Sequence, residues 1–197
     1  MEDIVERIRS IAISSIKCKK SLVDDYNLLC IIEEIINEVI RAFKGNNKVL
    51  FCGNGGSAAD AQHLAAELSG RFYMDRPPLD SEALHVNTSY ITAVANDYSF
   101  DEIFSRLVEA RCKPGDVIFG LSTSGNSKNV INAMRTANKI GTTTVGFTGN
   151  KGGALPELCT YCICVPSHNV ARIQETHIML GHIICEIVEE ALFKVEK

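Results

Sequence analysis

Two histidines and a glutamate have the spacing most suited to proton transfer or metal binding. His63 and Glu67 lie four residues apart in a segment of helical periodicity, so their side chains share one helix face. There they could bind one metal ion or act as an acid–base pair. Gln174 and His182 share a face of a second predicted helix near the carboxyl end. His182 lies in an apolar stretch, however, and spacing alone explains it equally well as a buried structural histidine.

Two loops rich in glycine and serine favour a phosphate group as ligand. Residues 53–57 and 122–127 each follow an apolar run and precede a predicted helix, whose first backbone N–H groups would face an anion. Serine and glycine are also ordinary turn and cap residues. Two such loops at equivalent places nevertheless favour a phosphate ester over turns alone.

Nucleotide binding has less support. The sequence lacks the Gly-x4-Gly-Lys-[Ser/Thr] motif, which excludes a P-loop nucleoside triphosphatase. Gly53-x-Gly55-x-x-Ala58 fits a dinucleotide fingerprint formally. The strand predicted next is followed by Asn87 and Thr88 instead of the carboxylate that holds a ribose, so this fit is weak.

The elements that must position these residues alternate between strand and helix. Strands are predicted at residues 48–52, 83–86, 116–121, 142–147 and 158–165. Helices are predicted at residues 58–68 and 90–95, in a segment ending near residue 138, and from about residue 170 onward. This alternation predicts an α/β fold with a parallel sheet covered by helices on both faces. Ligands of such sheets bind beyond the carboxyl ends of the strands, where both loops would lie.

Two further helices are predicted ahead of the sheet, at residues 4–12 and 28–43. The second has so wide an apolar stripe that it needs cover on more than one side. Packing in the core of the same chain and contact with another subunit both explain the stripe. We expect one domain, with residues 1–45 as a helical extension and an oligomer interface, and residues 46–197 as the α/β core.

The composition limits the binding partners and the cellular location that we expect. The 197 residues are 46% hydrophobic and 22% charged, with a net charge of −4, which argues against a nucleic-acid or anionic-membrane partner. No apolar run approaches the ~20 residues needed to cross a membrane, and the N-terminus lacks the features of a signal peptide, so we expect a cytoplasmic protein. The eight cysteines include Cys159-x-x-Cys162 followed by Cys164. Without a second ligand pair, we interpret these as small hydrophobic residues and not as a zinc or redox site.

Four motifs taken together resemble the sugar-isomerase (SIS) superfamily, and most closely the phosphoheptose isomerases. They are Phe-Cys-Gly-Asn-Gly-Gly-Ser-Ala-Ala-Asp-Ala-Gln-His at residues 51–63, Ala-Asn-Asp at 95–97, Leu-Ser-Thr-Ser-Gly-Asn-Ser at 121–127, and Ala-Arg-Ile-Gln-Glu at 171–175. The resemblance implies a three-layer αβα sandwich with a five-stranded parallel sheet, assembled as a homotetramer with active sites at subunit interfaces. It also implies conversion of D-sedoheptulose 7-phosphate to D-glycero-D-manno-heptose 7-phosphate, which feeds nucleotide-activated heptose for lipopolysaccharide and other surface glycans.

The resemblance assigns residues as well. Substrate-binding positions fall on Asn54, Gly55, Gly56, Ser57, Glu67, Arg71, Asn96, Asp97, Ser122, Thr123, Ser124, Ser127 and Gln174. Zinc-binding positions, for one ion per subunit, fall on His63, Glu67, Gln174 and His182. The sequence departs from the family at Ala171, where some members carry an acidic residue, and this puts one polar contact in doubt.

Aldose–ketose isomerisation moves a proton between C1 and C2 through an enediol, so it needs a base and a proton donor beside those carbons. We expect Glu67 to be the base and His182 the acid. A Glu67 that is bound to zinc is a poorer base, so its two roles are in tension.

The main alternative is a non-enzymatic SIS scaffold that binds the replication initiator protein. In that relative the positions matching Glu67 and His182 do not carry the acid and base, whereas this chain has both. A sugar-phosphate sensor domain is a third option, but such domains are usually attached to a further domain.

Overall fold

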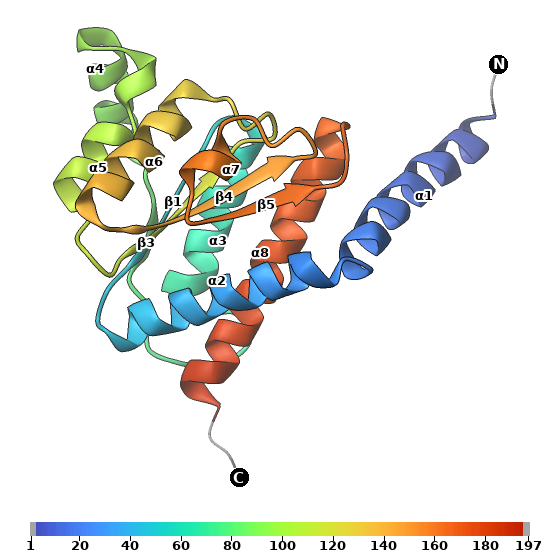
Figure 1. Ribbon diagram of the computed structural model, residues 1–197, viewed down its shortest axis with the longest axis horizontal. Coiled ribbons are helices and arrows are strands. Elements are labelled where there is room, and N and C mark those ends of the chain that lie inside the picture. Colours follow the sequence, from blue (N-terminus) through green and yellow to red (C-terminus); the bar gives the residue numbers. More distant parts are fainter. Residues whose placement is uncertain (1–2, 195–197) are drawn as a thin grey trace.

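The computed structural model describes residues 3–194 and contains one five-stranded parallel sheet (Figure 1). The strand order is β2-β1-β3-β4-β5. The strands are β1 (Val49–Gly53), β2 (Ser81–Ala83), β3 (Val117–Leu121), β4 (Thr143–Gly149) and β5 (Tyr161–Val165). Every residue of β1 and β3 is buried, as expected for parallel strands covered on both faces. The predicted α/β class and five-stranded parallel sheet are confirmed.

Helices form a layer on each face of the sheet. Alternate residues of β1 and β3 belong to two separate apolar cores, so the helices can be assigned to faces by the core they enter. One layer consists of α1 (Ile4–Val23), α2 (Tyr26–Lys44), α3 (Gly56–Ser69) and α8 (Val170–Phe193). The other consists of α4 (Thr88–Asp97), the 3-10 turn η1 (Phe100–Glu102), α5 (Ser105–Arg111), α6 (Lys128–Ile140) and α7 (Leu155–Leu158).

The two N-terminal helices differ in how they are covered. The stripe on α2 packs inside this chain, with Ile32, Ile35 and Val39 buried in the core, so core packing explains its width. Only the last turns of α1 enter that core, and the rest projects away from the body (Figure 1). That projecting part carries exposed isoleucines, Ile8 and Ile16 among them.

The structure corrects several element boundaries. The second strand is at 81–83 and not at 83–86, because this edge strand begins with the polar residues Ser81 and Glu82 and pairs with β1 over only three residues. The last strand begins at Tyr161 and not at residue 158, because Pro156 starts the short helix α7 at that place. The first helix continues to Val23 through lysines that extend no apolar pattern. Both η1 and α5 were not predicted.

Two expectations from composition can be compared with the structure. Within residues 3–194 no helix combines the length and apolar character that a membrane span requires. The eight cysteines are all free thiols, and Cys18, Cys52 and Cys185 are buried among apolar side chains.

Candidate active site

The site is built where α3 and α8 pack closely against each other. Leu64 on α3 lies against Gly181 on α8, where an added Cβ atom would stand only 2.4 Å from the Leu64 methyl carbons. A glycine at this crossing therefore lets the helices approach. His63 and His182 are the neighbours of these two residues in sequence, so the close crossing brings the two imidazole rings together.

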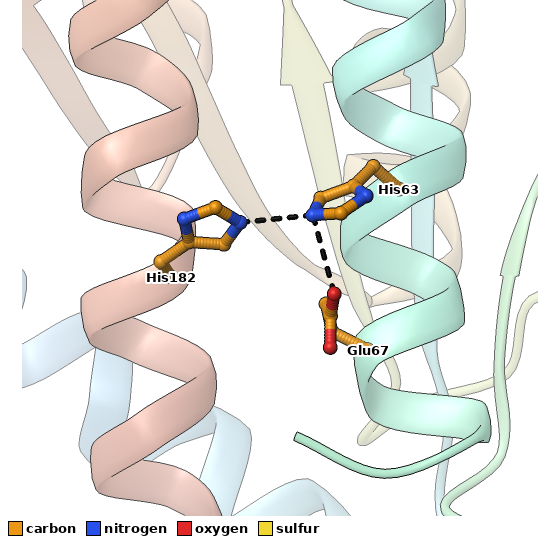
Figure 2. A group of neighbouring side chains, drawn as sticks. All are labelled: His63, Glu67 and His182. Atoms are coloured by element: carbon orange, nitrogen blue, oxygen red, sulfur yellow. Dashed lines mark hydrogen bonds and ion pairs between the residues drawn. The ribbon is translucent and has the colours of Figure 1, made fainter. Parts of the chain in front are cut away.

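Three of the predicted residues meet at this crossing (Figure 2). The Nε2 atoms of His63 and His182 are 2.9 Å apart, and His63 Nε2 is 3.2 Å from Glu67 Oε1. One ligand atom from each residue lies within 4.8 Å of the other two. The shared helix face predicted for His63 and Glu67 is present, and His182 faces both from α8.

These donor atoms fit a zinc ion. Two imidazole nitrogens and one carboxylate oxygen are a common zinc-binding set, and bonds of about 2.0–2.2 Å in tetrahedral geometry place ligand atoms roughly 3.4 Å apart. The 2.9 and 3.2 Å separations are close to that spacing. The His63 side chain is 48% exposed, so the cluster opens toward solvent on one side. A catalytic zinc site needs such an open position for its substrate.

Gln174, predicted as the fourth ligand, lies nearer the start of α3. Its carboxamide covers Gly56, where an added Cβ atom would stand 2.3 Å from Gln174 Nε2. The same side chain lines a cavity together with Asp60 and lowers the pKa of the Asp60 carboxyl. Gln174 therefore joins the glycine loop to α8, and its place among the zinc ligands stays a prediction.

Asp60 was missed by the sequence analysis. It is buried one helical turn before His63, and its Oδ2 atom has no hydrogen-bond partner in the described part of the chain. Burial raises the pKa of the Asp60 carboxyl, while Gln174, His63 and His182 oppose that rise. The intervals Asp60–His63–Glu67 are three and four residues, so the same helical spacing that singled out the other two could have found it.

The serine loop at residues 122–127 has the geometry of an anion site. The Ser122 Oγ atom lies 2.9 Å from Ser127 Oγ and 3.4 Å from Ser124 Oγ, so three hydroxyls converge at the start of α6. Thr123 and Ser124 also line a cavity of about 430 Å³. Gly125 adopts a positive φ of 67° at the turn. Hydroxyls and helix N-terminal amides of this kind bind phosphate.

The glycine loop at residues 53–57 lies beside the serine loop. The Asn54 and Asn129 side chains exchange two hydrogen bonds of 2.8 and 2.9 Å and so connect the loop to α6. Gly55 takes a positive φ of 56° at the start of α3, where Ser57 is buried. The role of Asn129 was not predicted, because it depends on this contact between distant segments.

The remaining predicted residues are not brought to the cluster. Asn96 and Asp97 are exposed at the end of α4, where the Asn96 side chain donates to Asp97 Oδ1 at 2.9 Å. Arg71 is exposed in the segment after α3. Their roles in substrate binding stay predictions, as does that of Thr123.

The buried structural histidine of α8 is His177 and not His182. His177 is fully buried, its Nε2 donates to the Thr148 carbonyl at 3.1 Å, and its Nδ1 has no partner in residues 3–194. Burial lowers the pKa of His177 to about 4, although the bond to Thr148 opposes this. The imidazole is therefore neutral in the folded protein near neutral pH.

This burial predicts a pH dependence of stability. Below pH 6.5 the unfolded chain binds a proton at His177, whereas the folded chain does not bind it until the pH falls to about 4. The free energy of unfolding should therefore fall by up to about 3 kcal/mol as the pH drops across that window. Urea unfolding at pH 7, 6, 5 and 4 checks this, with His177→Gln as the matched variant. A slope as steep in His177→Gln as in the original protein would contradict it.

The SIS domain family matches residues 29–149. A phosphoheptose isomerase of Aneurinibacillus thermoaerophilus is 49% identical over 187 residues, which cover 95% of this chain and 94% of that protein. Phosphoheptose isomerase 2 of Campylobacter jejuni is 49% identical over 98% of this chain and 96% of its own length.

The chain belongs to the phosphoheptose isomerase family. The solved structure of a phosphoheptose isomerase from Neisseria gonorrhoeae superposes with a TM-score of 0.89 at 37% identity, covering 95% of this chain and all of that one. The predicted SIS fold and isomerase activity are confirmed by these likenesses. The scaffold alternative gains no support, because the relatives that this chain matches are named as isomerases, which are enzymes.

Proposed function

We propose that the protein converts D-sedoheptulose 7-phosphate into D-glycero-D-manno-heptose 7-phosphate in the cytoplasm. Its product would feed nucleotide-activated heptose for lipopolysaccharide or other surface glycans. The observation that carries the proposal is the meeting of His63, Glu67 and His182 on α3 and α8. The first of these helices begins at the glycine loop, and Ile173 near the start of α8 lines the same cavity as Thr123 and Ser124. Family membership supports the same reaction class.

The distance from the glycine loop to the cluster of His63, Glu67 and His182 suits a long sugar phosphate. His63 lies seven residues after Gly56, which corresponds to about 10 Å along α3 at 1.5 Å per residue. The serine loop would hold the phosphate at one end of the substrate, away from the reacting carbons. Binding energy from that remote group would then orient C1 and C2 beside Glu67 and His182.

Proton transfer falls to Glu67 and His182. The Glu67 carboxylate would take the proton from one carbon and return it to the other, and His182 would exchange a proton with the substrate oxygen. Only Oε1 of Glu67 faces His63, while the other oxygen points away from the imidazoles (Figure 2). One carboxylate oxygen can therefore bind a metal while the other carries the proton, which relieves the tension between the two roles.

His63, Glu67 and His182 would hold a zinc ion, with Gln174 as the fourth ligand. Bound there, zinc would polarise the substrate carbonyl as a Lewis acid. The two imidazoles share a short contact that only one proton can fill, so at least one of the two nitrogens has a lone pair to offer.

The experiment that tests the function is turnover of sedoheptulose 7-phosphate by the purified protein, as isolated, after chelation and after zinc return. We expect conversion to the aldose, loss of activity on chelation and recovery with zinc. A folded protein that leaves the substrate unchanged in all three states would contradict the proposal. Activity that persists after chelation, without added metal, would show that the isomerase does not need zinc.

We also propose a homotetramer with active sites at subunit interfaces. The projecting part of α1 supports this, since Ile8 is 62% and Ile16 63% exposed in the single chain. A row of exposed isoleucines is stabilised when a second copy covers it. Arg71, Asn96 and Asp97, which lie apart from the cluster in one chain, would then act from or toward a neighbouring subunit.

The double substitution Ile8→Glu and Ile16→Glu is predicted to break this assembly. Charged side chains would oppose burial of the α1 face, so light scattering should show a mass below four chains. Circular dichroism should stay unchanged, because these positions contribute nothing to the core of the single chain. A tetramer that survives both substitutions would show that α1 does not form the interface.

A further inference from the structure

A buried ion pair lies outside the cluster of His63, Glu67 and His182. It connects the segment after α3 to α8, and these two helices carry the cluster. Arg76 Nε lies 2.8 Å from Glu189 Oε1, and the two side chains are only 1% and 2% exposed. Replacing a buried ion pair with apolar residues is often neutral or stabilising, so stability alone is a weak explanation for it. The other contacts of both side chains give a more specific one.

Glu189 fixes the segment that follows α3. Its carboxylate accepts hydrogen bonds from the backbone N–H groups of Phe72, Tyr73 and Met74, at 2.9, 2.6 and 2.9 Å. Burial alone would raise the pKa of this carboxyl, but those N–H groups and Arg76 outweigh it and hold the pKa at about 2. Glu189 is therefore a fixed anion that binds this segment to α8.

Arg76 closes the end of α3. Its guanidinium donates to the Glu67 carbonyl at 3.0 Å and to the Leu68 carbonyl at 2.8 Å. Carbonyls in the last turn of a helix have no partner within the helix, so Arg76 completes the turn that carries Glu67. The planar guanidinium reaches Glu189 and these carbonyls at once, which a lysine ammonium cannot do.

The same network reaches His182. Glu189 follows His182 by seven residues, or two turns of α8, so both lie on the face of α8 that meets α3. Glu189 accepts from the backbone N–H of Phe72, and the ring of that residue lies 5.8 Å from the His182 ring, measured between centroids. One ion pair thus bears on the backbone of Glu67 and on the packing of His182.

We propose that the Arg76–Glu189 pair is a positioning element that holds Glu67 and His182 in register for isomerisation. This inference rests on the proposed function. Neither side chain touches the cluster atoms in the described structure, so the pair acts through the last turn of α3 and through Phe72.

Glu189→Gln tests the proposal, because the amide keeps the shape and loses the charge. We expect kcat to fall at least about tenfold with KM within about twofold, as for partners that orient catalytic groups from outside the site. The imidazole NMR signals of His63 and His182 should also shift. Arg76→Lys should lower kcat similarly, since it keeps the charge and loses the bond to the Glu67 carbonyl.

Asp116→Asn is the matched control. Asp116 is also fully buried, accepts from the backbone N–H groups of Lys48 and Lys113, and pairs with Lys48 Nζ at 2.8 Å. It lies at the amino ends of β1 and β3, the opposite edge of the sheet from the loops. This variant should lose stability while keeping kcat per folded molecule and the imidazole signals.

Wild-type kcat and unshifted imidazole signals in both Glu189→Gln and Arg76→Lys would overturn the proposal. If Glu189→Gln fails to fold, Arg76→Lys decides the question alone. If the original protein shows no turnover, the proposed function fails separately. The imidazole signals then still decide whether the pair positions the cluster.

Discussion

Replacing Glu67 by glutamine is expected to lower kcat for sedoheptulose 7-phosphate by about 10²–10⁴-fold, the usual contribution of a general base. The amide retains the size of the carboxylate but cannot take a proton from carbon. KM should change far less, because the phosphate is held by the distant serine loop. Steady-state kinetics on zinc-saturated protein measures both quantities.

Glu109→Gln is the matched control for this substitution. Glu109 is exposed on α5, in the helix layer on the other face of the sheet, so the same chemical change there should leave kcat unaltered. A Glu67→Gln protein that is folded, contains zinc and turns over at the original rate would remove Glu67 from the mechanism.

Gly125→Ala is expected to raise KM at least about tenfold. An added Cβ atom would lie 1.8 Å from the Gly152 carbonyl oxygen, and the residue has a positive φ of 67°. The loop must move to accommodate it, which separates the hydroxyls of Ser122, Ser124 and Ser127. Phosphate binding should weaken as a result, and titration with inorganic phosphate alone should show the same loss.

Gly141→Ala separates the steric clash from the cost of a positive φ. Gly141 has a φ of 86° at the end of α6, with no atom within 4 Å of an added Cβ. It should lose about 1–2 kcal/mol of stability, the cost of a left-handed residue, with KM unchanged. Equal KM values for the two variants would show that the serine loop does not bind the phosphate.

Much of the fold follows from local signals. Each buried parallel strand is an apolar run that ends at a glycine or serine loop, and this pattern located β1, β3 and β4 within two residues. The edge strand β2 fails the same test because its first two residues are polar. The short helices α5 and α7 lack a long apolar period, so tertiary packing and Pro156 decide them.

Some residues of the site could likewise be predicted from local spacing, whereas others depend on contacts between distant segments. His63 and Glu67 are paired by helix geometry and could be predicted from spacing. His182 joins them from 119 residues away, where the close packing of Leu64 against Gly181 brings α3 and α8 together. Spacing therefore left open whether His182 was a functional residue or a buried structural histidine. Asn129, Arg76 and Glu189 act through contacts between distant segments, which no local pattern shows.

The measurement that tests the central claim most directly is isomerisation in D2O, followed by NMR of the heptose 7-phosphate product. If Glu67 transfers the proton through an enediol, the carboxyl can exchange that proton with solvent before returning it, so solvent deuterium should appear at C2 of the aldose. Glu67→Gln should lower both conversion and exchange at least about 10²-fold. Conversion or exchange at the original rate in Glu67→Gln would contradict the proposed mechanism. A folded, zinc-saturated protein that converts none of the ketose would contradict the proposed function itself.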